Sequence, residues 1–333
     1  MIPNIHINKS SIPILWVDTS IIFNITMIRL GKNFPSPQKQ RVESLYEGIK
    51  KATREGRLIC PLADQDEEIW VERKECLKTI HELSLGISTD STLAVNEKLF
   101  AIFAEAYVHE TKDVELDYNL LFYNDPIKEM EQVLSQPIYV TIDPPLIGGV
   151  DAVKSAKKEL LKKLNLIRES NVANKVTFEA QKKLEFMAEF DVIKKVLTDP
   201  QALFQLGLSK QDYFWNLLNV SEILKVWNSL VPKHGKENLS LLDFYKSDYY
   251  QQIPNKKISV EFYSKLITDK QPIRSGDVKD VEHISSMLPF VDMLITDKQR
   301  KVQLQKLKFN KEYQTTICYI GDSEEIGNFF NSL

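Results

Sequence analysis

Acidic residues follow short apolar runs at several places in this sequence. Asp18 ends the run IPILWVD, and Asp297 comes directly after MLIT. Asp277 and Asp280 stand three positions apart, a spacing that puts both side chains on one face of a helix. Further acids follow the run RLICP, namely Asp64, Asp66, Glu67 and Glu68. Because parallel strands bring their carboxyl ends to one edge of a sheet, we expect these groups to converge there.

Carboxylates that converge without histidine or cysteine partners form a site of hard oxygen ligands. Such a site suits Mg²⁺ or Mn²⁺ better than zinc. Two such ions activate water and stabilise the leaving oxygen in phosphodiester cleavage. We recognise no arrangement of Ser, His and Asp, or of Cys and His, that would supply a protein nucleophile. The acids therefore predict phosphodiester hydrolysis that depends on a divalent cation.

Each acid also has a structural interpretation when it is taken alone. Asp18 could cap the helix that follows it, and Asp297 could belong to a turn. The acids after RLICP, and the pair Asp277 and Asp280, stand where a helix begins, and the helix dipole favours acids there. His283 could orient a metal ligand, although such a histidine is more often a packing residue. The joint order of the four groups favours a shared site over these separate explanations.

The elements that would position these acids are short apolar strands separated by helices. Apolar runs predict strands at 12–18, at 57–61 and over FVDMLIT and QTTICYIG, and helical periodicity fills most of the sequence between them. That alternation favours an α/β fold with a parallel sheet flanked by helices. Helical periodicity dominates 90–271, with one strand-like interruption, QPIYVTIDPP. We therefore predict a core formed by 1–89 and 272–333, split by a large, mostly helical insertion.

The hexapeptide LITDKQ occurs twice, at 266–271 and at 294–299. The first copy ends a helical pattern and runs into Pro272, whereas the second ends an apolar strand. Only the second copy has the context of a site at the end of a strand.

Composition excludes several classes of protein. The 333 residues are 43% hydrophobic and 27% charged, which is ordinary for a globular protein. The formal net charge of −3 gives no global signature of nucleic-acid binding, so any such contact requires a local basic patch. Three cysteines without a CxxC pair favour neither a disulfide framework nor structural zinc and predict a cytoplasmic protein. Every apolar run is shorter than the ~18 residues of a membrane helix, so we expect no membrane partner.

Two motifs resemble those of a known family. VDTS, after its apolar run, resembles the first-strand motif of PIN-domain nucleases. The segment DVEHISSMLPFVDMLITDK resembles the late signature of that family, in which an aspartate opens a helix and a later strand ends in threonine and an acid. The resemblance covers residues 12–84 and 274–333. It implies a PIN-like, metal-dependent nuclease that acts on RNA more readily than on DNA.

The resemblance also implies roles for individual acids. The aspartate roles fall to Asp18, Asp280 and Asp297, and the remaining acid falls to Glu67 or Glu68. The implied catalytic residues are Asp18, Glu67, Glu68, Asp280 and Asp297. The implied ligands of Mg²⁺ or Mn²⁺ are Asp18, Glu68, Asp277, Asp280 and Asp297, with Asp277 as an auxiliary acid.

Basic residues directly after Asp297 are candidates for substrate binding. Lys298, Arg300 and Lys301 lie on a predicted helix and could hold phosphates electrostatically. RNA is the favoured nucleic-acid partner, and the helical insertion could bind a protein partner or a second copy of the chain. Two alternatives remain open: an inactive PIN-like binding or scaffold protein, and another phosphohydrolase with an acidic pocket.

Overall fold

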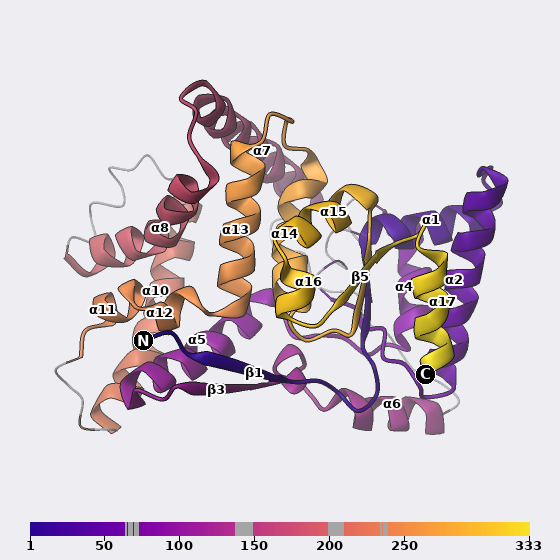
Figure 1. Cartoon of the computed structure of the whole chain (residues 1–333), viewed down its shortest axis with the longest axis horizontal. Helices are drawn as coiled ribbons and strands as arrows, with labels where there is room; N and C mark the ends of the chain where they lie inside the picture. The colour runs from indigo at the N-terminus through magenta and orange to yellow at the C-terminus, as the bar shows by residue number, and fades with distance from the viewer. Residues whose placement is uncertain are drawn as a thin grey trace. The chain divides into compact units, whose positions relative to one another are not determined.

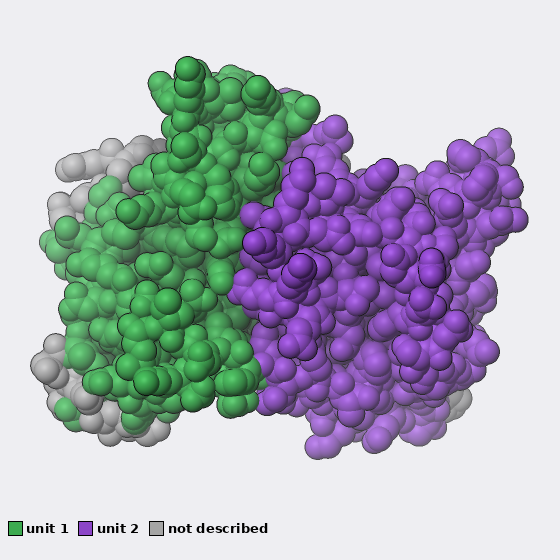
Figure 2. Space-filling model, in the orientation of Figure 1, with its two compact units in different colours: residues 1–6, 93–116, 164–273 green, residues 7–92, 117–163, 274–333 purple. Residues whose placement is uncertain are grey.

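The computed structural model describes residues 1–63, 65, 69, 73–136, 149–198, 210–233, 235 and 239–333. These residues form two compact units (Figure 2). Unit 1 comprises Met1–His6, Leu93–Leu116 and Leu164–Ile273, and unit 2 comprises Ile7–Thr92, Asp117–Lys163 and Arg274–Leu333. Among the described residues, no helix is long and apolar enough to cross a membrane. The predicted strand QPIYVTIDPP lies, except for Gln136, outside the described residues.

Unit 2 is built on a parallel sheet whose strands come from both ends of the chain (Figure 1). β2 (Leu15–Val17) pairs with β4 (Met293–Thr296), and β4 pairs with β5 (Thr316–Tyr319), all in parallel. Leu15 lies opposite Met293, which in turn lies opposite Thr316. The strands are short and almost entirely buried, as expected for a sheet covered on both faces. The predicted α/β class is thus confirmed.

The segment RLICP lies on the other side of β2. Leu15 N donates to Ile59 O at 2.9 Å, and Ile59 N donates to Pro13 O at 3.0 Å. Further out, Leu62 forms a parallel bridge with Ser88. RLICP was predicted as a strand, but it forms one isolated bridge, at Ile59, and a second follows it at Leu62; Pro61 between them lacks the N–H that a continuous ladder requires.

Helices cover both faces of this sheet. The core beneath one face contains alternate strand residues, among them Leu15, Val17 and Ile295. The intervening residue Trp16 points to the other face, where its ring lies 6.4 Å from that of His283. The helices and 3₁₀ segments with residues in unit 2 are α1 (Thr19–Arg29), α2 (Ser36–Arg54), η1 (Lys74–Cys76), α4 (Leu77–Ser84), η2 (Tyr118–Leu121), α6 (Pro126–Ser135), the first part of α7 (Gly149–Ala173), α14 (Ser275–Met287), α15 (Lys298–Lys306), α16 (Phe309–Glu312) and α17 (Ser323–Ser332).

Unit 1 is mostly helical, as predicted for most of the insertion. Its core is rich in aromatic rings, with Phe244 in contact with Tyr107, Trp227 and Tyr250. Its helices are α5 (Thr92–His109), which begins one residue before the unit, the last part of α7, α8 (Phe178–Thr198), α10 (Lys210–Lys233), α11 (Leu241–Lys246), α12 (Asp248–Gln251) and α13 (Pro254–Thr268).

The units differ from the predicted boundaries in two places. Residues 117–163 belong to unit 2 although they were assigned to the insertion, and Phe122 of this segment forms an antiparallel bridge with Thr89 of the predicted core. Residues 1–6 belong to unit 1, where β1 (Asn4–Asn8) pairs with β3 (Asp113–Asp117). Neither strand was predicted, because their alternation of polar and apolar residues is short and its partner is distant in sequence.

Candidate functional site

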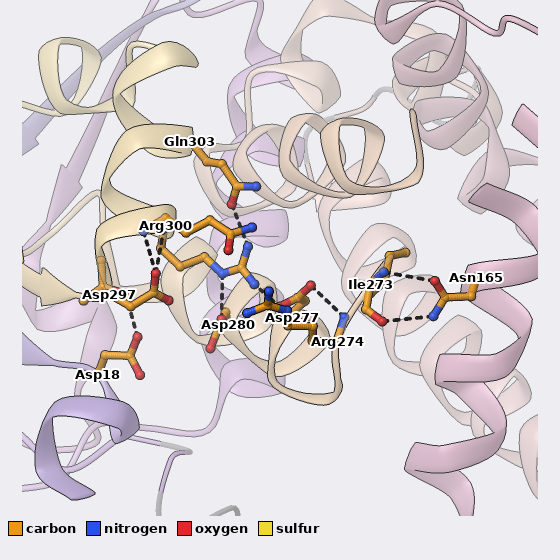
Figure 3. Close-up of polar contacts among 11 residues, drawn as sticks. Asp18, Asn165, Ile273, Arg274, Asp277, Asp280, Asp297, Arg300 and Gln303 are labelled. Carbon is orange, nitrogen blue, oxygen red and sulfur yellow. Dashed lines mark hydrogen bonds and ion pairs between the residues drawn. The ribbon is translucent and has the colours of Figure 1, made fainter. Parts of the chain in front are cut away.

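A pocket of about 400 Å³ lies in unit 2, at the carboxyl ends of β2 and β4. Asp18, Asp277, Asp280 and Asp297 all contribute to its lining (Figure 3). Within the sheet, the Ile59 segment lies on one side of β2 and β4 lies on the other. The chain passes from β2 to the Ile59 segment first and returns to β4 later. The boundary between β2 and β4 is therefore the point where the winding of the sheet reverses. Open α/β sheets bind ligands at such switch points.

Asp18 is the most buried of the four acids. It is 4% exposed, and its Oδ1 accepts the backbone N–H of Ser20 at 3.0 Å, which caps α1. Its Oδ2 accepts the hydroxyl of Thr296 at 2.6 Å. Burial raises the pKa of Asp18, and the nearby Asp297 carboxylate adds to this, whereas the hydrogen bonds from Thr296 and Ser20 act in the opposite direction. The capping interpretation is therefore correct, but it does not explain why a second acid lies nearby.

Asp277 and Asp280 lie on one face of α14 and contact the same guanidinium group. Asp277 Oδ2 accepts the backbone N–H of Arg274 at 2.8 Å, and Asp277 Oδ1 accepts Nη2 of Arg300. One turn later, Asp280 Oδ2 accepts Nε of Arg300 at 2.7 Å. Asp297, at the start of α15, accepts the backbone N–H groups of Gln299 and Arg300.

Arg300 is the cation at the centre of this arrangement. Its side chain is only 3% exposed, and its Nη1 donates to Gln303 Oε1 at 2.6 Å. Burial alone would lower the pKa of Arg300, but the attraction of Asp280, Asp277 and Asp297 outweighs it and raises the pKa. The sequence suggested that Arg300 would hold substrate phosphates. Its side chain instead lies buried as the counterion of two acids.

The other two basic residues expected at the substrate do not line the pocket. Lys301 Nζ donates to Asp322 at 2.5 Å, and the exposed Lys298 lies with its Nζ 5.7 Å from the centre of the Tyr319 ring. The pocket lining contains Arg73 and Arg274 instead. Neither arginine was predicted from the sequence as a site residue, although Arg274 directly precedes α14 and its acids.

The fourth expected acid was predicted in the segment after RLICP. Asp64, Asp66, Glu67 and Glu68 lie outside the described residues. Within the same segment, the buried Gln65 is described, and its Nε2 donates to Val17 O at 3.2 Å. Gln65 therefore packs against the end of β2.

The described acids of this pocket have the chemistry of metal ligands but not the arrangement of a metal site. The carboxylate oxygens are suitable ligands for Mg²⁺ or Mn²⁺. Across the described part of the chain, however, no three His, Cys, Asp or Glu residues are arranged to hold a metal ion. Arg300 instead pairs with Asp277 and Asp280. His283 is buried beside Trp16 and does not line the pocket, in agreement with its packing interpretation.

Comparison of the chain with models of protein families, with curated proteins and with solved structures found no match.

Proposed function

We propose that unit 2 is a PIN-like domain that hydrolyses phosphodiester bonds, preferentially in RNA, with a divalent cation. The observation that carries this proposal is the convergence of four carboxylates from three separate segments in one pocket at the switch point of a parallel sheet. Arg73 and Arg274 line the same pocket and would meet the phosphates of a nucleic acid. Carboxylates for a cation and arginines for phosphates together support a phosphodiester substrate.

Asp18, Asp280 and Asp297, with Asp277 as an auxiliary acid, are the described residues that would hold the cation. When bound, Mg²⁺ or Mn²⁺ supplies an activated water and neutralises charge on the phosphate oxygens. Thr296 and the backbone of Ser20 fix the orientation of the Asp18 carboxylate. Because Arg300 engages Asp280 and Asp277, it has to release at least one of them before three carboxylates become available.

The position of Arg300 also favours a second candidate function. A permanent counterion between Asp277 and Asp280 would leave the pocket without a metal, and unit 2 would then be an inactive binding or scaffold domain. A partner protein or a second copy of the chain would bind the helices of the predicted insertion. Cation binding discriminates between the two candidates.

The test combines Mn²⁺ binding with cleavage of labelled RNA and single-stranded DNA, in Mn²⁺ or in EDTA. We expect Asp280→Asn and Asp297→Asn to lower the rate by about 100-fold or more, since each removes a charge that holds the cation. Asp269→Asn is a matched control because Asp269 occupies the same position in the other LITDKQ copy and lies outside the pocket. We expect it to leave the rate unchanged.

Cleavage that persists in EDTA, or equal rates for Asp297→Asn and Asp269→Asn, would overturn the mechanism. Absence of both cleavage and Mn²⁺ binding would favour the scaffold candidate.

A further inference from the structure

A second pocket, of about 530 Å³, lies within unit 1 between four helices. α5, α8, α10 and α13 each line it with residues spaced three and four apart, which is the spacing of a helix face that packs into a core. On α13, for example, these residues are Lys256, Ser259, Val260 and Tyr263. The volume lies within the range of about 300–1,000 Å³ that small-molecule sites have, and the core of a helical bundle is a common place for such sites.

One charged pair in the pocket lining is already satisfied. The ammonium group of Lys256 contacts Glu189 Oε2, which also accepts the hydroxyl of Tyr250 at 2.8 Å. Tyr245 donates to the other oxygen of Glu189 at 3.3 Å. Burial alone would raise the pKa of Glu189, but Lys256 and both hydroxyls outweigh it and lower the pKa. This pair therefore contributes no net charge to the pocket.

The remaining charge of the pocket is negative. Glu97, Glu185 and Glu222 line it from α5, α8 and α10. Among the described lining residues, Lys256 is the one basic side chain, and it is paired with Glu189. Glu222 also forms an exposed pair with Lys225, which lies outside the lining. Three carboxylates from three helices thus create a negative potential at a pocket with apolar walls.

We propose that this pocket binds a small organic cation with an apolar body. The apolar part packs against Phe100, Ile193 and Val260, and the ammonium group is attracted by the three glutamates. Apolar burial supplies most of the affinity, and the glutamates select the sign of the ligand's charge. This site is independent of the nuclease proposed for unit 2.

Three probes of the same shape test the selection by charge: 4-phenylbutan-1-amine, 4-phenylbutan-1-ol and 4-phenylbutanoate. Their affinities for the full chain are measured by calorimetry at low salt. We expect the amine to bind about tenfold more tightly than the alcohol, which is the gain that a few partly exposed ion pairs supply. The carboxylate should bind most weakly. Equal affinity for the three probes, or absence of binding by all three at millimolar concentration, would overturn the proposal.

Two variants test the location of the site. Ser259→Phe fills part of the pocket and should lower the affinity for the amine by about tenfold or more, a loss of about 1.4 kcal/mol. Ser221→Phe, at an exposed position of α10 outside the lining, is the matched control and should bind like the wild type. Circular dichroism confirms that both variants fold. Unchanged binding by a folded Ser259→Phe would place the probe elsewhere and overturn the assignment.

Discussion

Arg300 lies among the acids of the unit 2 pocket, where a cation is electrostatically favourable. Its guanidinium contacts Asp277 and Asp280, and its backbone N–H reaches Asp297. A buried acid pair of this kind is destabilised when its counterion is removed, because two like charges then remain without compensation. The same loss would make the carboxylates available to a metal ion.

We therefore predict opposite effects of Arg300→Gln in the absence and presence of Mn²⁺. In EDTA the variant should lose about 3–5 kcal/mol of unfolding free energy, as expected when one partner of a buried ion pair is removed. Mn²⁺ should restore more stability to the variant than it adds to the wild type, because ligands stabilise the state that binds them. Urea unfolding in EDTA and in Mn²⁺ measures both effects.

The double variant Asp277→Asn/Arg300→Gln controls for charge balance. It removes one charge of each sign and should be more stable in EDTA than Arg300→Gln alone. If Mn²⁺ stabilises wild type and Arg300→Gln equally, Arg300 does not compete with the cation.

The acids that line this pocket could be predicted from the sequence, whereas its basic residues could not. Asp18, Asp277, Asp280 and Asp297 converge because each stands beside a strand end or at a helix start, and both positions can be recognised in the sequence. No such pattern in the sequence indicates that the Arg300 side chain points into the protein. The side chain of a basic residue on the first turn of a helix can point into solvent, contact a phosphate or pair with a buried acid.

At the scale of elements, the repeated hexapeptide shows how context determines structure. At 266–271, LITDKQ forms the end of α13 and the residues after it, with Asp269 at the C-cap. At 294–299 it forms the end of β4 and the start of α15, with Asp297 at the N-cap. In the second copy, Leu294 and Ile295 pair with β2 on one side and with β5 on the other. The sequence distinguished the copies only through the residues that flank them.

Lys9 links two segments that precede strands of the unit 2 sheet. Its Nζ donates to Pro289 O at 3.0 Å and to Val291 O at 2.7 Å. Burial lowers the pKa of Lys9 to about 8, although the Asp292 carboxylate opposes the shift. Between that value and the ordinary value of 10.5, the unfolded chain binds more protons at this position than the folded protein. The contribution of Lys9 to stability therefore rises with pH across this interval.

We predict that the stability of the wild type relative to Lys9→Met increases from pH 8 to pH 10. The reason is that Lys9 loses its proton at a lower pH in the folded protein than in the unfolded chain. The cost of burying its charge disappears with the proton. Urea unfolding of both proteins at each pH gives the difference. A difference that is constant with pH, or that falls, would contradict the assignment.

At the scale of the whole molecule, the unit 2 sheet joins the two ends of the chain. Ile14 N donates to Asp292 Oδ2 at 2.7 Å across 278 positions of sequence, and Asp18 N donates to Ile295 O at 2.9 Å. Contacts of such long range contribute to slow folding because the chain must close a large loop before they form. β2 cannot complete its pairing within the N-terminal part alone.

We predict that a chain ending at Ile273 loses the protection of β2 against hydrogen exchange. Removal of β4 and β5 takes away the strand that pairs with all three residues of β2 and leaves β2 with the Ile59 segment on its other side alone. Hydrogen-exchange mass spectrometry of peptides that cover Leu15–Val17 measures the loss. A chain ending at Asp322 lacks only α17 and should retain most of the protection. Equal protection in both truncated chains would show that β2 does not need β4.

The pairing of β2 with β4 also determines when the acidic pocket can exist during synthesis. A ribosome makes Asp18 long before Asp297, and the sequence between them must emerge before the two can meet. A nascent chain of this protein therefore carries an incomplete acid set while it is still attached to its own messenger RNA. Any activity of the pocket begins only after β4 and Asp297 have emerged from the ribosome.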